Sequence, residues 1–267
     1  MTRRLPNAAT FIALAFCVAA LRADISVSTV RLPGSSLDTS VRNEADRATR
    51  QAARWLADRQ LADGSWGESN RVLHTSLALS ALAAARQPEH SDVIARAAVW
   101  LGGTETNRLD NLGDHAWRLI ALSLAVPESP ERQSILIRMA GQAEYAKKDA
   151  PEDNLQFWRE VQNQAGISPT PIPVHGCATN ALAKIASTWP PLLADNHAAW
   201  QLTRRINRLG NVPLLNGNTP IDWRTHIAER LINSQKSDPQ GGGFWPADTP
   251  DRQLAETACG LLCLLEL

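Results

Sequence analysis

The sequence predicts an all-α protein built as an α/α toroid, a two-layer barrel of helical hairpins with about nine or ten helices. No segment shows the sustained apolar–polar alternation that is typical of a strand. Some helix-like segments are apolar along one stripe only, whereas those that follow several of them are apolar on nearly every side. Because a helix that is apolar all round must be covered all round, we expect outer amphipathic helices to alternate with inner buried ones.

Residues 1–23 are expected to be a signal peptide. Two arginines precede an apolar run over residues 8–21, which ends in small residues before Asp24. This order is typical of a secretory signal, with cleavage after Ala20 or Ala23. The run has about 14 residues, fewer than the roughly 20 needed to span a bilayer. We therefore expect an exported protein, periplasmic or secreted, with no stable membrane insertion after cleavage.

A polar linker rich in Ser and Thr is expected over residues 24–42, and the helical toroid domain over residues 43–267. Without residues 1–23 the chain has 24 basic and 27 acidic residues. This slight acidic excess argues against a nucleic-acid partner, which would need a basic face. Cys259 and Cys263 lie four residues apart in an apolar helical run, so we expect both thiols to pack in the core.

The pattern of apolar residues places the helices in order along the chain. Outer helices are expected near residues 43–59, 89–102, 130–146, 195–209 and 222–235. Inner helices are expected near residues 73–86, 113–126, 175–188 and 252–267. Between them, residues 147–173 are rich in proline and irregular, with a short helix around 154–164. A loop over residues 210–221, rich in Pro, Gly and Asn, replaces an expected inner helix.

A motif occurs twice, in the first and last hairpins. Each copy begins with two neighbouring apolar or aromatic residues, Trp55-Leu56 or Leu231-Ile232. A glutamine follows within four residues of the pair, and a Gly-x-Trp segment comes after the glutamine. A buried helix that opens with a threonine comes next, at Thr75 or Thr257. The second copy carries a four-residue insertion before its Gly-x-Trp. The motif residues are Trp55, Gln60, Gly64 and Trp66 in the first copy and Gln235, Gly243 and Trp245 in the second.

This pattern resembles the QW repeat of squalene and oxidosqualene cyclases, which is related to the repeats of protein prenyltransferases. The resemblance implies a structural role, in which the glutamine caps the next inner helix and the tryptophan stacks on it. The chemistry of these families is not matched. The sequence contains no Asp-x-Asp-Asp acid motif, no Asp-x-Cys zinc pair and no Gly-Cys-Gly-Glu-Gln thioester motif. The small number of Phe and Tyr residues also argues against carbocation chemistry.

Alignment of the inner helices places four polar residues near their starts: His74, His115, His175 and Glu256. In a barrel of parallel inner helices these starts share one mouth, with Asp114 and Cys177 adjacent. The set could provide a general base, and His74, His115, His175 and Cys177 could bind a transition metal. A divalent metal is not the favoured expectation, because polar residues also gather at helix starts as caps.

The sequence leaves three functions open. The favoured one is a toroid without cyclase activity that binds a protein, a glycan or an apolar small molecule at its rim. The alternative is an enzyme of hydrolase or polysaccharide lyase type that uses histidine and glutamate at the same rim, an analogy made at the level of the fold. A divergent terpenoid cyclase or prenyltransferase comes last, because the acid and zinc motifs are missing.

Overall fold

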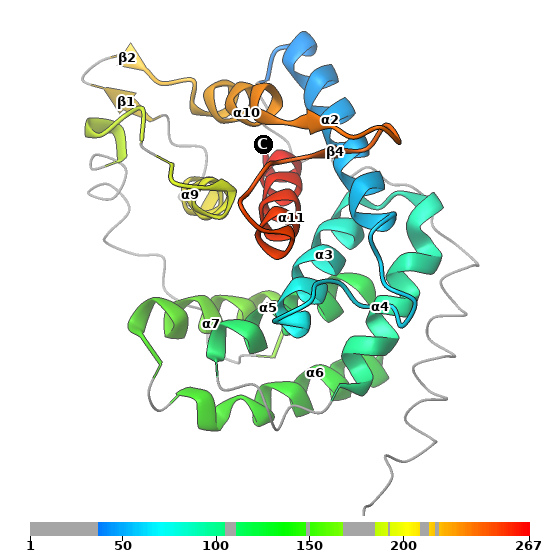
Figure 1. Cartoon of the computed structure of the whole chain (residues 1–267). Helices are drawn as coiled ribbons and strands as arrows, with labels where there is room; N and C mark the ends of the chain where they lie inside the picture. Colours follow the sequence, from blue (N-terminus) through cyan, green and yellow to red (C-terminus); the bar gives the residue numbers. More distant parts are fainter. Residues whose placement is uncertain are drawn as a thin grey trace, which may run out of the picture. The chain divides into compact units, whose positions relative to one another are not determined.

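The computed structural model describes residues 37–104, 111–147, 150–167, 185–191, 193–208, 214–216 and 219–267, which are mostly helical (Figure 1). This confirms the predicted all-α class. The helices are α2 (Thr39–Ala57), α3 (Arg71–Ala85), α4 (Ser91–Gly103), α5 (Leu112–Ala125), α6 (Pro130–Gln142), α7 (Glu152–Gln164), α9 (Asn196–Arg208), α10 (Trp223–Ser234) and α11 (Pro250–Glu266), with short turns η1 (Pro88–His90) and η2 (Glu144–Lys147). Two small antiparallel pairs join β1 (Leu215–Asn216) to β2 (Thr219–Pro220) and β3 (Lys236–Ser237) to β4 (Gly243–Phe244).

Short polar side chains begin most of these helices. The first N–H groups of a helix have no internal partner, and a side-chain oxygen can accept their hydrogen bonds. In the described part of the chain, seven N-cap residues do so: Asp38, Asn70, Asn111, Ser129, Asp195, Asp222 and Thr249. Because Asp38 caps α2, residues 39–42 belong to this helix and not to the predicted linker.

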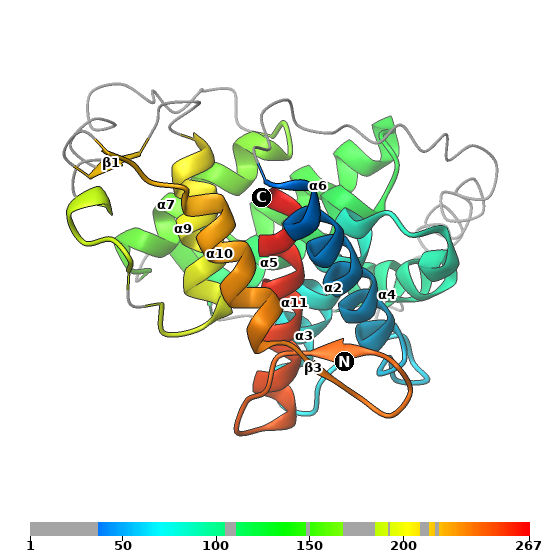
Figure 2. The same ribbon diagram turned by 90° about the horizontal axis from the view of Figure 1, so that it is seen from above.

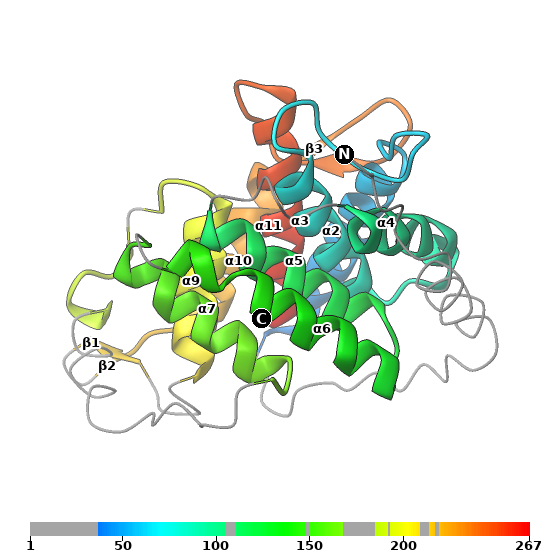
Figure 3. The same ribbon diagram turned by 90° about the horizontal axis from the view of Figure 1, so that it is seen from below.

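The chain divides into two compact units, and the first contains the described residues between 59 and 167. In this unit α5 packs between α3 and α7, while α4 and α6 contact α5 from the outside (Figure 3). Side chains on every side of α3 and α5 are buried, as their apolar sequences predict. The sequence suggests only a short helix around 154–164, but α7 is a full helix of 13 residues beside α5.

The second unit combines residues 37–58 with the described residues from 185 to 267. Here α11 packs against α9, α2 and α10, and β4 lies on α2 (Figures 1 and 2). The first helix of the described chain, α2, therefore packs against three elements near the end of the chain, α10, β4 and α11. Cys259 and Cys263 are buried free thiols in α11, which confirms their expected place in the core.

Within the second unit, α9 runs parallel to α11. Three hydrogen-bonded pairs keep the same spacing along both helices: Asn196 with Glu256, Thr203 with Cys263, and Asn207 with Glu266. The sequence predicts an amphipathic helix over residues 195–209, and the bounds of α9 agree within one residue. Ala199, Thr203 and Ile206 of α9 are buried, whereas Gln201 and Arg205 are exposed. The sequence did not predict that α9 runs parallel to α11.

Candidate functional site

The first repeat motif forms a turn that is fastened to α3. The Trp66 side chain is fully buried, and its backbone N–H donates to Thr75 Oγ1 at 2.9 Å. Gly64 has a φ of +91°, and a Cβ there would come within 2.8 Å of the Arg96 carbonyl oxygen. Asp63 accepts hydrogen bonds from Ser65 and Arg71, which hold its pKa at about 2. The motif therefore fixes the path of the chain into a buried helix.

The second motif repeats this connection in the other unit. Trp245 N–H donates to Thr257 Oγ1 at 3.2 Å, and its indole Nε1 donates to the Leu231 carbonyl oxygen at 2.9 Å. A Cβ at Gly260 would lie 2.8 Å from the Trp245 ring, so the ring rests directly on α11. Because the same Trp-to-Thr hydrogen bond occurs in both copies, the two copies of the motif have the same structural role.

The two glutamines do not cap the inner helices, so that implication of the resemblance is wrong. Gln60 Nε2 donates to the carbonyl oxygens of Val93, in α4, at 2.8 Å and Gly64 at 3.0 Å. Gln235 Nε2 donates to the Ala48 carbonyl oxygen, in α2, at 2.9 Å. Each glutamine thus donates a hydrogen bond to the backbone of a neighbouring helix, α4 or α2. The starts of α3 and α11 are capped by Asn70 and Thr249, whose short side chains sit at the N-cap itself.

The three predicted site residues of the first unit lie in packed surroundings. His74, Asp114 and His115 are all less than a tenth exposed. The His74 ring lies under Gly67, where a Cβ would come within 2.6 Å of Nδ1. Asp114 Oδ2 accepts a hydrogen bond from Asn70 Nδ2 at 3.0 Å, so the starts of α3 and α5 lie side by side as expected. This packing is typical of structural positions.

The described residues do not form the predicted metal site. His175 and Cys177 lie outside the described residues. Within the described ranges, no group of three or more His, Cys, Asp and Glu side chains could hold a metal ion. Glu256, the remaining predicted residue, belongs to the second unit and has different surroundings.

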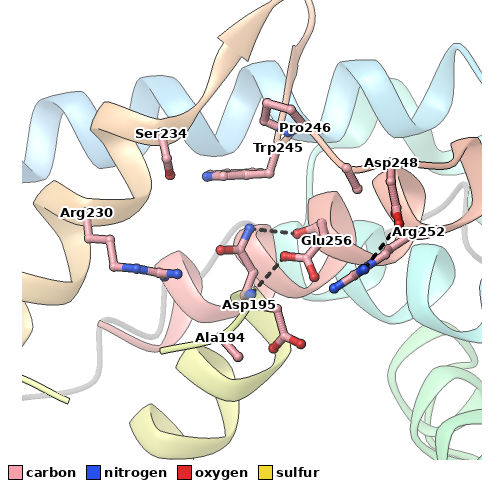
Figure 4. A pocket seen from close by; sticks show the side chains of 11 residues that line it. Ala194, Asp195, Arg230, Ser234, Trp245, Pro246, Asp248, Arg252 and Glu256 are labelled. Carbon is pink, nitrogen blue, oxygen red and sulfur yellow. Dashed lines mark hydrogen bonds and ion pairs between the residues drawn. The ribbon is translucent and has the colours of Figure 1, made fainter. Parts of the chain in front are cut away.

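Glu256 lines a pocket of about 370 Å³ at the adjoining starts of α9 and α11 (Figure 4). We call this the α9–α11 pocket. α10 and the segment between β4 and α11 complete its wall. The lining residues are Ala194, Asp195, Asn196, Arg230, Ser234, Trp245, Pro246, Ala247, Asp248, Arg252 and Glu256. The second repeat motif therefore contributes Trp245 to the wall of a cleft at the start of an inner helix.

The carboxylates of the α9–α11 pocket hold the start of α9. Glu256 Oε2 accepts from Asn196 N–H at 2.8 Å, and Asp195 Oδ1 accepts from Ala198 N–H at 2.7 Å. Asn196 Nδ2 also donates to the Glu256 carbonyl oxygen at 3.1 Å. The pKa of Glu256 is raised, chiefly by burial and also by the nearby Asp195 charge. The Asn196 hydrogen bond and the charges of Arg252 and Arg230 oppose this shift.

The arginines of the pocket differ in their partners. Arg252 Nη1 pairs with Asp248 Oδ2 at 3.5 Å, at an exposed position. Arg230 Nη2 donates to the Leu193 carbonyl oxygen at 3.4 Å, while its buried Nη1 has no hydrogen-bond partner in the described part of the chain. The pocket can therefore offer a guanidinium donor and two carboxylate acceptors to one small polar molecule.

Sequence reasoning found Glu256 but missed Asp195, Asn196, Arg230 and Arg252. These residues come from the start of α9, from α10 and from α11, and the parallel register of α9 and α11 brings Asp195 and Asn196 beside Glu256. The one available signal was the Asp195-Asn196 pair before an amphipathic stretch, which is typical of a helix start.

Comparisons with family models, with curated proteins and with solved structures gave no match. In the described ranges, none of the helices has both the length and the apolar character that a membrane crossing requires.

Proposed function

We propose that this chain is an exported α/α-toroid repeat protein that binds a small polar ligand in the α9–α11 pocket and has no cyclase activity. The observation that carries the proposal is the pocket itself, at the adjoining starts of the parallel helices α9 and α11. The repeated Trp-to-Thr hydrogen bond supports the hairpin repeat of a toroid, in which such starts gather around one mouth.

The lining argues against the apolar small molecule that was among the ligand classes expected from the sequence. Most of its side chains are charged or polar, and apolar ligands prefer walls of aliphatic and aromatic residues. A polar ligand would instead find donors on Arg230 and acceptors on Asp195 and Glu256. The α9–α11 pocket is thus suited to a small hydrophilic molecule.

The proposal is tested by a thermal-shift screen of the purified chain against amino acids, sugars, organic acids and polyamines. A ligand that binds the native state raises the midpoint of unfolding. Arg230→Ala should abolish the shift for any true ligand of the pocket, while Arg205→Ala, an exposed change on α9, should leave it intact. Hits that persist in Arg230→Ala, or a screen without hits, would contradict the proposal. Cleavage after Ala20 or Ala23 is checked by mass spectrometry of the exported product.

A second candidate, a rim enzyme of hydrolase type, is favoured by the raised pKa of Glu256. Two carboxyl groups in one cleft, one of which has a raised pKa, are an arrangement that general acid catalysis uses. Release of nitrophenol from nitrophenyl glycosides tests this activity. Turnover by the wild type that is lost in Glu256→Gln would replace the binding role with an enzymatic one.

A further inference from the structure

Arg230 lines the α9–α11 pocket without a direct ion pair to any described carboxylate, although its charge lowers the pKa of Glu256. No carboxylate within the described residues pairs with its guanidinium, and its buried Nη1 has no acceptor. A buried donor without a partner costs free energy that a bound acceptor can recover. A carboxylate suits this position best, because its two oxygens match the geometry of a guanidinium.

Two carboxylates from different elements share the pocket with Arg230. Asp195 precedes α9 and Glu256 lies in α11, whereas Arg230 projects from α10 (Figure 4). Each carboxylate accepts one backbone N–H through one of its oxygens. The second oxygen of each therefore keeps acceptor capacity toward a ligand. Because the Asp195 charge also disfavours ionisation of Glu256, a cation between them would relieve their repulsion.

The remaining charges of the lining compensate each other. Arg252 and Asp248 form their own ion pair at the pocket edge. Among the described residues, the lining groups without a direct ion pair are then one guanidinium and two carboxylates, on separate walls of one cleft. This distribution calls for a ligand that carries both signs of charge.

The size of the pocket and the burial of Trp245 narrow the choice of ligand class further. A volume of about 370 Å³ is near the lower end of the range for small-molecule sites. The Trp245 side chain is only 2% exposed and offers no open face on which a sugar ring could stack. These two features favour a small charged molecule over a glycan.

We infer that the α9–α11 pocket binds a small zwitterion, an α-amino acid or a dipeptide, with its carboxylate at Arg230 and its ammonium group at Asp195 and Glu256. This inference rests on the proposed binding function and names its ligand class. Ligand carboxylate and ammonium each meet an opposite charge, so both ends are needed for full affinity.

Isothermal titration of the purified chain tests the inference with five probes: glycine, glycylglycine, N-acetylglycine, glycinamide and glucose. N-acetylglycine lacks the ammonium group, glycinamide lacks the carboxylate, and glucose lacks both charges. We expect glycine or glycylglycine to bind at least tenfold more tightly than the other three, and the tighter of the two tells an amino acid from a dipeptide. This comparison uses the wild-type protein only and does not depend on the folding of a variant.

Variants assign the charges to residues. Arg230→Ala should weaken zwitterion binding at least tenfold and leave glycinamide binding unchanged, and Glu256→Gln should weaken both. Arg205→Ala should alter neither. Equal affinities for zwitterion and single-charge analogues, or no zwitterion binding, would overturn the inference. If glucose binds and Arg230→Ala abolishes its binding, the ligand class is wrong but the proposed binding function stands.

Discussion

Replacement of Gly260 by alanine should destabilise the protein, although the same change stabilises an ordinary helix. Gly260 lies inside α11, where alanine is favoured over glycine by about 1 kcal/mol. The new Cβ, however, would lie 2.8 Å from Trp245 Cε3 and 3.0 Å from Asn196 Nδ2. Carbon atoms in contact normally stay about 3.5–4.0 Å apart, so the side chains would have to move.

The Trp245 ring has little freedom to move away. Its backbone N–H is held by Thr257 and its indole N–H by the Leu231 carbonyl oxygen. We therefore place the overpacking cost in the upper part of the usual range, at about 2–3 kcal/mol. After the helix-propensity gain of about 1 kcal/mol, a net loss of about 1–2 kcal/mol of unfolding free energy remains.

The matched control is Gly141→Ala in α6, where a Cβ would meet nothing within 4 Å. This change should stabilise by about 0.5–1 kcal/mol. Urea unfolding followed by far-UV circular dichroism measures both variants, with unchanged m-values required for the comparison. If Gly260→Ala stabilised the protein as much as Gly141→Ala does, Trp245 would not rest on α11 and the structural role of the motif would be refuted.

Three further predictions concern the motif and the pocket. Thr75→Val should cost about 1–3 kcal/mol, because the buried Trp66 N–H loses its acceptor; hydrogen exchange at the Trp66 amide should accelerate. The pKa of Asp63 is lowered from 3.8 to about 2, so it contributes stability above pH 3.8 that is lost as the pH falls toward 2; Asp63→Asn should lack this acid-dependent loss in thermal unfolding. The pKa of Glu256 is raised, so its effect on stability depends on pH in the opposite direction. Its contribution to stability is present below the ordinary pKa of 4.5 and is lost as the pH rises through the raised pKa. Glu256→Gln should remove this loss from a series of thermal unfolding measurements at increasing pH.

The buried helices were predictable because their apolar residues leave no polar face. α3, α5 and α11 lie within one or two residues of their expected bounds, and the cap residues Asn70 and Thr249 explain where two of them begin. Thr75 and Thr257 could be matched from their spacing to the Gly-x-Trp segments, and the structure shows that each accepts a hydrogen bond from the backbone N–H of the tryptophan in its segment. Local periodicity and turn chemistry sufficed for these features.

The place of α9 and the composition of the pocket were not predictable, because they depend on packing between distant segments. The amphipathic pattern of α9 says which face is buried but not which helix covers it. In the sequence, Arg230 is one of several polar residues of the amphipathic helix α10 and nothing distinguishes it from the others. Asp195 lies beside Glu256 because α9 and α11 pack in parallel. The glutamines were misassigned because a long amide can reach a neighbouring helix as readily as the helix that follows it.

The parallel register of α9 and α11 is the central claim, because the pocket exists only where their starts meet. Thr203 Oγ1 lies 3.3 Å from Cys263 Sγ in the buried interface, so Thr203→Cys places two thiols in reach of each other. After refolding in a glutathione redox buffer, peptide mapping by mass spectrometry should find a disulfide between residues 203 and 263, and none to the exposed control Gln201→Cys. A link to Cys263 from residue 201 but not from residue 203 would contradict the register and, with it, the pocket.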